Sequence, residues 1–245
     1  MRRISAYIIS LLIITSNFSV VAQDSIKVPL NIRVGFDIYG PASYFSDRDR
    51  NNLSLEGFFA LERDTKKSFV LEAGYQNFKY SQYNYSYLSK GAFIKAGIDF
   101  NSIKPFLAEG KYYAGIGLRY GLSIYSSEFP EFKFGYSFPG NYWGTASGSI
   151  SPSVHAAHFF EVTPGIKTEI FKNMSIGWNL RLRFMVYTGT GKDLKPVSVP
   201  GYGNGVKSFN PGMNYYFILN IPYKSVFVKP EPDKVTEPET EAVKK

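Results

Sequence analysis

The residues from Tyr112 to Ile124 alternate between two kinds of side chain. In this stretch, YYAGIGLRYGLSI, every even-numbered position is apolar or aromatic, and most odd-numbered positions carry glycine, serine or arginine. An α-helix would scatter the apolar residues around its circumference and would contain Gly115, Gly117 and Gly121, each of which costs about 1 kcal/mol relative to alanine. A period of two over this length therefore predicts a long β-strand with one apolar and one polar face.

The same alternation recurs in seven other segments. We predict strands at residues 30–39, 53–62, 68–76, 91–100, 112–124, 158–170, 175–186 and 210–221. The connections between them alternate between long and short, and the longest are irregular loops at 126–154 and 188–208. This pattern is typical of an up-and-down β-barrel whose short turns lie on one rim and whose long loops lie on the other. A ten-stranded barrel is the alternative, if Phe129 to Trp143 forms an extra hairpin.

Packing volume indicates which face of the strands points inward. The interior of an eight-stranded barrel is only wide enough for side chains to fill, and the large apolar residues of eight long strands would overfill it. Glycine recurs on the polar face, where it weakens an exposed strand but makes room inside a narrow barrel. The sequence therefore predicts an all-β fold, an eight-stranded antiparallel up-and-down transmembrane β-barrel with a polar, charge-paired interior. Aromatic residues at the strand ends suit the lipid headgroup level, and these are Tyr39, Tyr75, Tyr112, Tyr187, Phe209 and Tyr223.

The polar face carries nearly equal numbers of acidic and basic residues. We expect a charge network that fills the barrel interior and includes Arg33, Asp37, Glu56, Glu72, Lys95, Asp99, Arg119, Glu161, Lys167, Arg181 and Arg183. Glu62 and Glu169 lie on the same face. Buried charges are tolerated when they are paired and hydrogen-bonded, so we interpret these residues as structural. A barrel this narrow and this cross-linked is expected to conduct ions poorly.

The two ends of the chain differ in composition from the rest. Residues 1–22 have the basic start, the short apolar run and the Val20-Val21-Ala22 cleavage site of a secretory signal peptide. Residues 23–223 form the predicted barrel, and residues 224–245, rich in Pro, Glu and Lys, are expected to be a disordered periplasmic tail. The chain has no cysteine, which excludes disulfides and a lipidated cysteine. We expect localisation in the outer membrane after signal-peptide export.

Several segments of the chain resemble a family of uncharacterised Bacteroidetes outer-membrane β-barrel proteins, known as a domain of unknown function. They are Asp37-Ile38-Tyr39-Gly40-Pro41-Ala42, residues 115–121, the stretch from His158 to Arg181, and the loop Pro200-Gly201-Tyr202-Gly203. Phe159 stands where a tryptophan is expected in that family. The resemblance covers most of the chain outside the tail, and it implies a fold and a compartment but no activity.

No motif in the sequence predicts a catalytic, cofactor-binding or metal site. His155 and His158 are the only histidines, and on a strand they point to opposite faces because they are three residues apart. At most one of them could serve a hydrolase site with Ser151, Ser153 or Glu161. The formal net charge of +8 comes from dispersed basic residues, which gives no reason to expect binding to nucleic acid. We expect no cofactor.

The predicted barrel suits a structural or binding component of the cell envelope that acts through its extracellular loops. We expect a monomer in contact with outer-membrane lipid and lipopolysaccharide, with loops and tail available to an envelope protein partner. Three alternatives stay open at this point. They are a narrow channel for ions or small solutes, a surface lipid-modifying hydrolase that uses a rim histidine, and a soluble lipocalin-like carrier.

Overall fold

The computed structural model describes residues 25–46, 51–134, 146–190 and 195–229. Eight long strands dominate the structure, as predicted. They are β1 (Ile26–Asp37), β2 (Asn52–Glu62), β3 (Lys67–Ser81), β4 (Tyr85–Asn101), β5 (Tyr112–Phe134), β6 (Ala146–Phe171), β7 (Met174–Tyr187) and β10 (Phe209–Val228). The remaining elements are two short helices and a two-residue strand pair: α2 (Tyr39–Ser46), α3 (Pro105–Ala108), β8 (Ser198–Val199) and β9 (Gly203–Asn204).

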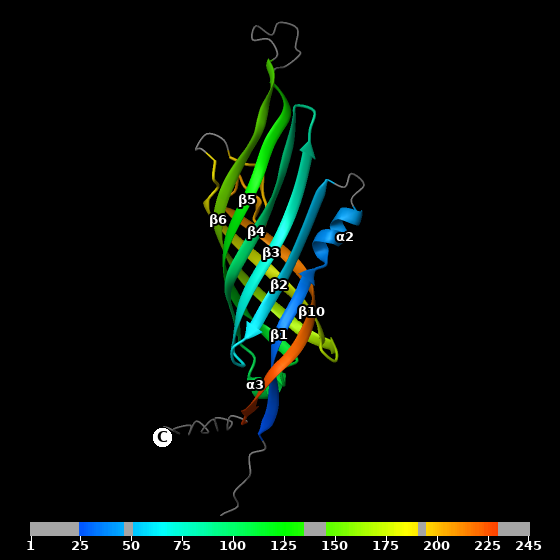
Figure 1. Cartoon of the computed structure of the whole chain (residues 1–245), viewed down its shortest axis with the longest axis vertical. Helices are drawn as coiled ribbons and strands as arrows, with labels where there is room; N and C mark the ends of the chain where they lie inside the picture. The colour runs from blue at the N-terminus through cyan, green and yellow to red at the C-terminus, as the bar shows by residue number, and fades with distance from the viewer. Residues whose placement is uncertain (1–24, 47–50, 135–145, 191–194, 230–245) are drawn as a thin grey trace, which may run out of the picture.

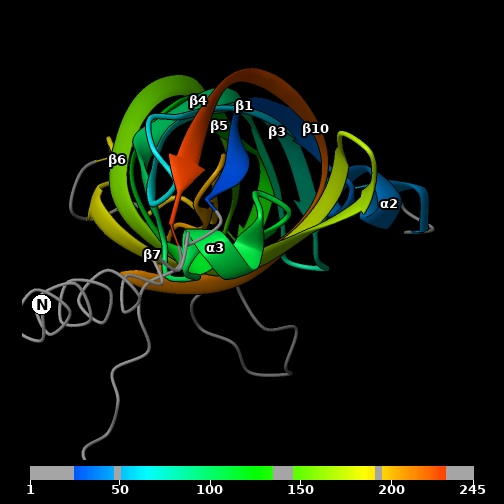
Figure 2. The same cartoon turned by 90° about the horizontal axis from the view of Figure 1, so that it is seen from below.

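The eight long strands form one antiparallel sheet that closes on itself. Their order around the ring is β1-β10-β7-β6-β5-β4-β3-β2. The first and last strands close the ring, with a register that runs from Ile26 opposite Val228 to Asp37 opposite Tyr216. The strands are inclined around a long axis in Figure 1, and the view from below in Figure 2 shows them surrounding an interior. The all-β, antiparallel and eight-stranded parts of the prediction are confirmed.

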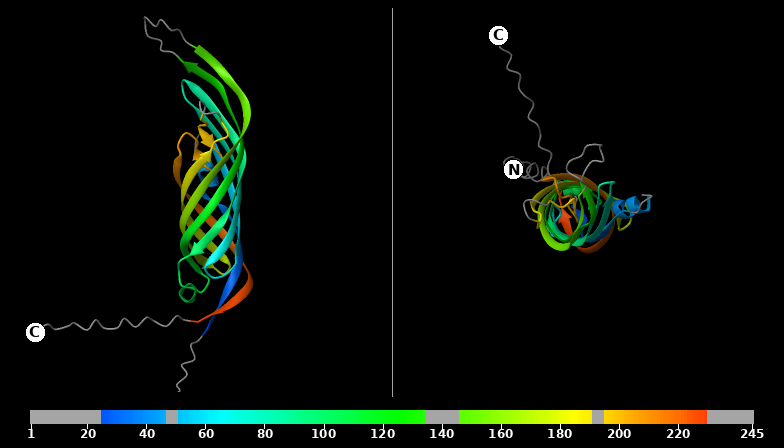
Figure 3. Two further views of the ribbon diagram at one scale, coloured as in Figure 1. Left: turned by 90° about the vertical axis from the view of Figure 1, so that its left-hand side faces the viewer. Right: turned by 90° about the horizontal axis from the view of Figure 1, so that it is seen from above.

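β5 and β6 continue far beyond the other strands. They pair from Tyr112 opposite Thr168 to Phe134 opposite Ala146, and their ends project above the rest of the ring (Figures 1 and 3). The prediction of an irregular segment at 126–154 is therefore wrong for the described residues. Two serine- and glycine-rich strands can pair here because each satisfies the backbone hydrogen bonds of the other. The described part of the alternative hairpin, 129–134, is the end of β5, and its remainder lies outside the described residues.

The other connections also differ from the expectation in detail. β3 and β4 extend into the expected loop near 81–89 and leave only residues 82–84 between them. α2 follows shortly after β1 and was not predicted. Pro41 lies in its first turn, where a backbone N–H has no acceptor within the helix, so the lack of an N–H in proline costs no hydrogen bond. α3 covers the lower end of the ring between β4 and β5 (Figure 2).

The start of β1 and the end of β10 lie side by side at the lower end of the ring (Figure 1). β10 runs to Val228 and pairs with β1 up to Ile26, so the expected start of the irregular tail at residue 224 is too early. The rest of the expected tail, from residue 230, and the expected signal peptide lie outside the described residues. Among the residues that are described, no helix is long and apolar enough to cross a membrane.

The two faces of the closed sheet have opposite character. Every ring strand exposes large apolar side chains on its outer face, for example Phe36, Leu55, Leu71, Ile94, Leu118, Ile166, Ile176 and Leu219. The inner face instead buries arginine, lysine, glutamate, serine and asparagine side chains. The six aromatic residues expected at strand ends are all exposed. Tyr112, Tyr187 and Phe209 are terminal residues of strands, whereas Tyr75 lies within β3, Tyr223 lies within β10 and Tyr39 begins α2.

Candidate functional site

A cluster of buried charges fills the middle of the ring. At its centre, the Arg181 guanidinium of β7 contacts the carboxylates of Glu56, Glu72 and Glu161, which come from β2, β3 and β6. The N–O distance is 3.0 Å to Glu72 and 3.0 Å to Glu161. Together with Lys95, these four residues are called the central cluster below.

Lys95 of β4 is the second cation of the central cluster. Its ammonium lies 3.0 Å from Glu56, 3.5 Å from Glu72 and 3.6 Å from Glu161. The side chains of Lys95 and Arg181 are both 0 % exposed. Removing an ion from water is costly, and a buried charge is tolerated only when partners replace the lost hydration. Both cations meet this requirement by contacting the same three glutamates.

Two further arginines complete the charge balance of the middle of the ring. Arg119 Nε lies 3.1 Å from Glu72, and its Nη2 lies 2.6 Å from Asp99. Arg183 Nε lies 3.1 Å from Glu161, and its Nη1 donates a 3.1 Å hydrogen bond to the carbonyl oxygen of Tyr202. With these pairs, four cations face four carboxylates. The middle of the ring is therefore electrically neutral.

A glycine makes room for the pair of Arg119 and Asp99. A Cβ at Gly117 would lie 2.4 Å from the Asp99 carboxylate and 2.7 Å from the Arg119 guanidinium. Both distances are too short for non-bonded atoms, so a side chain at this position would push the ion pair apart. This agrees with the expected use of glycine on the inner face of a narrow ring.

Asp37 lies outside this network, although the sequence analysis places it there. Its carboxylate accepts backbone N–H bonds from Gly40 at 2.9 Å, Tyr39 at 3.3 Å and Tyr215 at 3.3 Å. A carboxylate that accepts the first N–H groups of a helix is a typical helix cap. The partners of Asp37 are thus backbone amides of α2 and β10 rather than cations.

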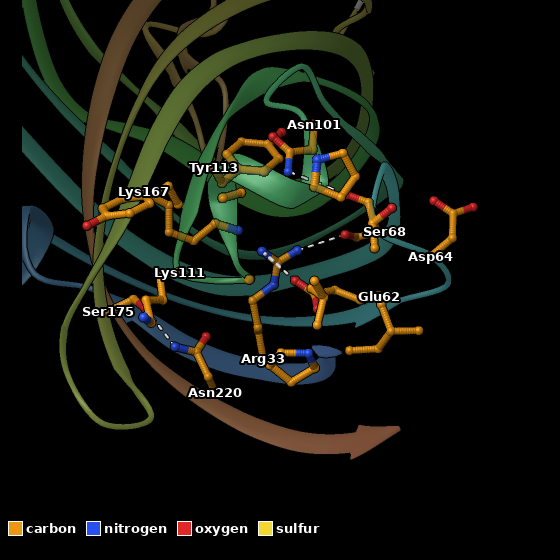
Figure 4. A pocket seen from close by; sticks show the side chains of 18 residues that line it. Arg33, Glu62, Asp64, Ser68, Asn101, Lys111, Tyr113, Lys167, Ser175 and Asn220 are labelled. Atoms are coloured by element: carbon orange, nitrogen blue, oxygen red, sulfur yellow. Dashed lines mark hydrogen bonds and ion pairs between the residues drawn. The ribbon is translucent and has the colours of Figure 1, made fainter. Parts of the chain in front are cut away.

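Arg33 and Lys167 lie below the central cluster, in a separate cavity of about 40 Å³. Arg33 pairs with Glu62 at 3.2 Å and donates a 2.8 Å hydrogen bond to Ser68. The Lys167 ammonium lies 4.2 Å from the centre of the Tyr113 ring. We call this cavity the lower chamber. Each ring strand contributes one side chain that Figure 4 labels in its wall: Arg33, Glu62, Ser68, Asn101, Tyr113, Lys167, Ser175 and Asn220.

The connection between β7 and β10 folds back into the upper end of the ring. Residues Ser198 to Tyr202, which we call the upper plug, are buried except for Gly201, which is partly buried. The Ser198 carbonyl oxygen accepts a 3.2 Å hydrogen bond from the Tyr87 hydroxyl, and the Tyr202 ring lies 5.5 Å from that of Phe159. Burial raises the pKa of the Tyr202 phenol. The expected long loop at 188–208 is therefore partly an internal plug.

Gly201 gives the upper plug its shape. Its φ angle is +74°, a value that residues with a side chain rarely adopt. A Cβ at this position would lie 2.5 Å from the Phe93 ring. The Gly201 amide donates a 3.3 Å hydrogen bond to the Gln76 side chain. Beside the plug, a cleft of about 360 Å³ opens at the upper end and is lined in part by Asn52, Gln76 and Asn214.

Some important inward residues were missed from the sequence. Tyr216 donates a 2.6 Å hydrogen bond to Glu56 and also contacts Arg181, so it brings β10 into contact with the central cluster. Its position has the same parity as Asn214 and Asn220, which the alternation placed inside. Strict parity could have found it, but its aromatic ring suggested the apolar face. The burial of the upper plug could not be predicted in this way, because a loop has no regular alternation of apolar and polar residues.

The two histidines lie on opposite faces of β6, as their spacing predicts. The ring of His158 lies 6.1 Å from that of Tyr120, on the outward row. His155 lies on the inward row, where its Nε2 is 2.7 Å from the Ser153 hydroxyl and its Nδ1 is 3.2 Å from the Gly189 carbonyl oxygen. The third group of this arrangement is therefore a carbonyl rather than a carboxylate, and Glu161 belongs to the central cluster instead.

The described residues contain no group of three or more His, Cys, Asp or Glu side chains that could hold a metal ion. The features above define a class: a closed eight-stranded antiparallel sheet with an apolar outer face and a neutral, buried charge cluster inside. The chain belongs to a family described as a domain of unknown function (DUF6048), whose model matches residues 3–225. This confirms the expected membership of a family without an assigned activity. No curated protein matches the chain.

Proposed function

We propose that the chain is an outer-membrane β-barrel that serves as a structural or binding component of the cell envelope. The observation that carries this proposal is the apolar outer face on all eight strands, combined with charges buried inside. In water this arrangement would expose large apolar patches, which soluble monomers rarely do. In a bilayer it is stable, because hydrocarbon covers the apolar face and the closed sheet leaves no unpaired edge.

The interior favours a closed barrel over a narrow channel. Arg181 and Lys95 contact three glutamates in the middle of the ring, and the upper plug fills part of the ring above them. The cavities below the central cluster measure about 40 and 30 Å³, which is room for a few water molecules at most. Neither cavity provides a continuous path for a hydrated ion. The barrel therefore does not conduct in this conformation.

The upper end offers the surfaces for binding. The β5–β6 extension carries exposed polar residues well above the apolar belt (Figure 3), and the cleft beside the upper plug presents amide side chains such as Asn52 and Gln76. In this proposal both features face the outside of the cell, where an envelope protein partner or lipopolysaccharide is available. In the same proposal, the start of β1 and the end of β10 lie on the periplasmic side.

The Ser153–His155 pair keeps the lipid hydrolase as a second candidate. With a carbonyl oxygen next to Nδ1, that nitrogen carries the proton, and Nε2 can accept the Ser153 hydroxyl hydrogen. A carboxylate would stabilise the imidazolium that forms in such a reaction, and a carbonyl does so less well. We therefore expect no labelling of the purified barrel by a fluorophosphonate probe. Labelling that Ser153→Ala removes would establish a hydrolase.

Two measurements test the proposal. Purified protein folded into maltoside micelles should migrate differently on a gel before and after boiling, and it should float with phosphatidylcholine vesicles in a density gradient. In a planar bilayer, the folded protein should give no steady current. Recovery in the aqueous fraction without detergent would support a soluble carrier instead. Regular, ion-selective openings would show that the protein is a channel and not a closed barrel.

A further inference from the structure

Three cationic side chains line the lower chamber, Arg33, Lys111 and Lys167, and two of them have a carboxylate partner: Lys111 pairs with the exposed Glu109, and Arg33 pairs with Glu62. Arg33 is paired with Glu62, whose other carboxylate oxygen accepts the 2.7 Å backbone N–H bond of Asn31. Within the described part of the chain, no carboxylate lies within 4.0 Å of the Lys167 ammonium. Figure 4 shows the Lys167 and Arg33 groups pointing toward the same part of the cavity. Among the described residues, Lys167 is therefore the one cation of the chamber lining that has no carboxylate within 4.0 Å.

The acidic residues around the rim of the chamber already have other partners. Asp64 accepts two backbone N–H bonds within its own turn, at 2.7 and 2.8 Å. Glu109 pairs with Lys111 at 2.9 Å, where both are exposed. Glu169 accepts a 3.3 Å backbone N–H bond from Asn173. None of these carboxylates therefore serves as the counter-ion of Lys167.

The hydrogen-bonding groups of the chamber also favour an acceptor as ligand. Ser68 accepts its hydrogen bond from Arg33, and Ser175 accepts a 2.6 Å bond from Asn220. In both cases the serine oxygen is the acceptor, so each hydroxyl hydrogen is free to donate. Arg33 is 4 % exposed, and its buried Nε–H has no hydrogen-bond partner among the described residues, as is also true of Arg181 Nε in the central cluster.

We propose that the lower chamber binds a small oxyanion, a phosphate or carboxylate group, next to Lys167 and Arg33. The ion would supply the missing negative charge and would accept hydrogen bonds from the ammonium and the serine hydroxyls. Both cations lie near the Tyr113 ring, with Lys167 Nζ at 4.2 Å and Arg33 Cζ at 5.9 Å from its centre. The volume of about 40 Å³ admits a group of a few heavy atoms. The chamber has these properties whether or not the sheet spans a membrane.

Inorganic phosphate is the probe for this site. The protein is folded in maltoside micelles, and the temperature at which half of the folded gel band is lost is measured with phosphate or with sodium chloride at equal ionic strength. A ligand that binds only the folded state raises this temperature. We expect a rise of roughly 5–10 °C when phosphate reaches about a hundred times its dissociation constant. An equal rise with sodium chloride would overturn the proposal.

Three variants locate the effect. Lys167→Gln should lose most of the phosphate-dependent rise, and Lys167→Arg should keep it because the charge remains. Lys172→Gln removes the same charge from an exposed turn at the same end of the molecule and should respond like the natural chain. Each variant is compared with itself without phosphate, so a general loss of stability does not affect the result. An unchanged response in Lys167→Gln would exclude the chamber as the site.

Phosphatidylglycerol added to the same micelles distinguishes the source of the anion. If this lipid raises the midpoint at micromolar concentration and leaves no further rise for phosphate, then the site takes a lipid headgroup. If only free phosphate acts, then the site takes a soluble anion. If neither ligand raises the midpoint of the natural chain, no oxyanion binds in the chamber and the proposal fails.

Discussion

The central cluster and the lower chamber contain the same kinds of side chain on the same inner face, but their charges are balanced differently. Lys95 in the cluster has three carboxylates within 3.6 Å. Lys167 in the chamber has a tyrosine ring at 4.2 Å and, among the described residues, no carboxylate within 4.0 Å. Each lysine lies on the inward row of its strand, Lys95 on β4 and Lys167 on β6.

This difference separates a structural role from a binding role. A charge whose partners are all supplied by the fold has no need of a ligand, and the most stable state of the cluster is the closed one. A charge that has no such partner among the described residues is available to a ligand. The presence of buried charges therefore does not by itself indicate a binding site. The balance of cations and carboxylates within each layer of the ring distinguishes a binding role from a structural one.

The largest expected effect comes from breaking the balance of the central cluster. Arg181→Gln would leave three glutamates with too few cations in a buried site, which typically costs about 3–5 kcal/mol of the free energy of unfolding. Urea unfolding in micelles, followed by tryptophan fluorescence, measures this loss. Arg63→Gln, at an exposed turn, is the matched control and should change stability by less than about 0.5 kcal/mol. Equal effects of the two variants would show that the cluster does not stabilise the ring.

A second prediction concerns the wall that surrounds both regions. Leu118 is 51 % exposed on the outer face, so an aqueous protein would accept a charged residue there at little cost. If the outer face meets lipid, Leu118→Arg costs about 2–4 kcal/mol near the middle of the bilayer. The yield of folding into phosphatidylcholine vesicles checks this. Ser147→Arg, on the exposed β5–β6 extension, is the control and should fold as well as the natural chain.

The third prediction sharpens the account of the cluster as a unit. Arg181 and Glu161 are in direct contact at 3.0 Å, so the losses caused by Arg181→Gln and Glu161→Gln should not add. We expect the double variant to be more stable than the sum of the single losses predicts, by about 1–3 kcal/mol. A double-mutant cycle from urea unfolding measures the difference. Additive losses would mean that the two residues act independently.

The fold could be predicted from the sequence because a strand has a period of two. That period assigned Arg181, Lys95 and Lys167 to the inner face, and the alternation of long and short connections indicated a ring. It could not pair the charges, since Glu56 and Arg181 are 125 residues apart and meet only across a closed sheet. Pairing depends on register and on closure, and neither is encoded in a single strand.

The same limit explains the other differences. Asp37 shares the parity of the inner face, but it lies at the end of its strand, where the start of α2 offers backbone N–H groups instead of cations. The upper plug has no period at all. Its only sequence signal was Pro200-Gly201-Tyr202-Gly203, a pattern that indicates a turn but not the direction in which the turn folds.

The smallest expected effect provides the most direct comparison of the two regions, because it uses one substitution in both. In buffer without phosphate, Lys95→Gln should cost about 3–5 kcal/mol, since it removes a partner from three buried carboxylates. Lys167→Gln should change stability by less than about 1 kcal/mol. The substitution removes the contact of the ammonium with the Tyr113 ring, which is worth roughly 0.5–1 kcal/mol, but it also removes a charge that has no carboxylate partner. Urea unfolding of both variants in maltoside micelles measures the contrast. A cost at Lys167 as large as that at Lys95 would mean that the chamber is a second closed charge network, and its place as a binding site would be lost.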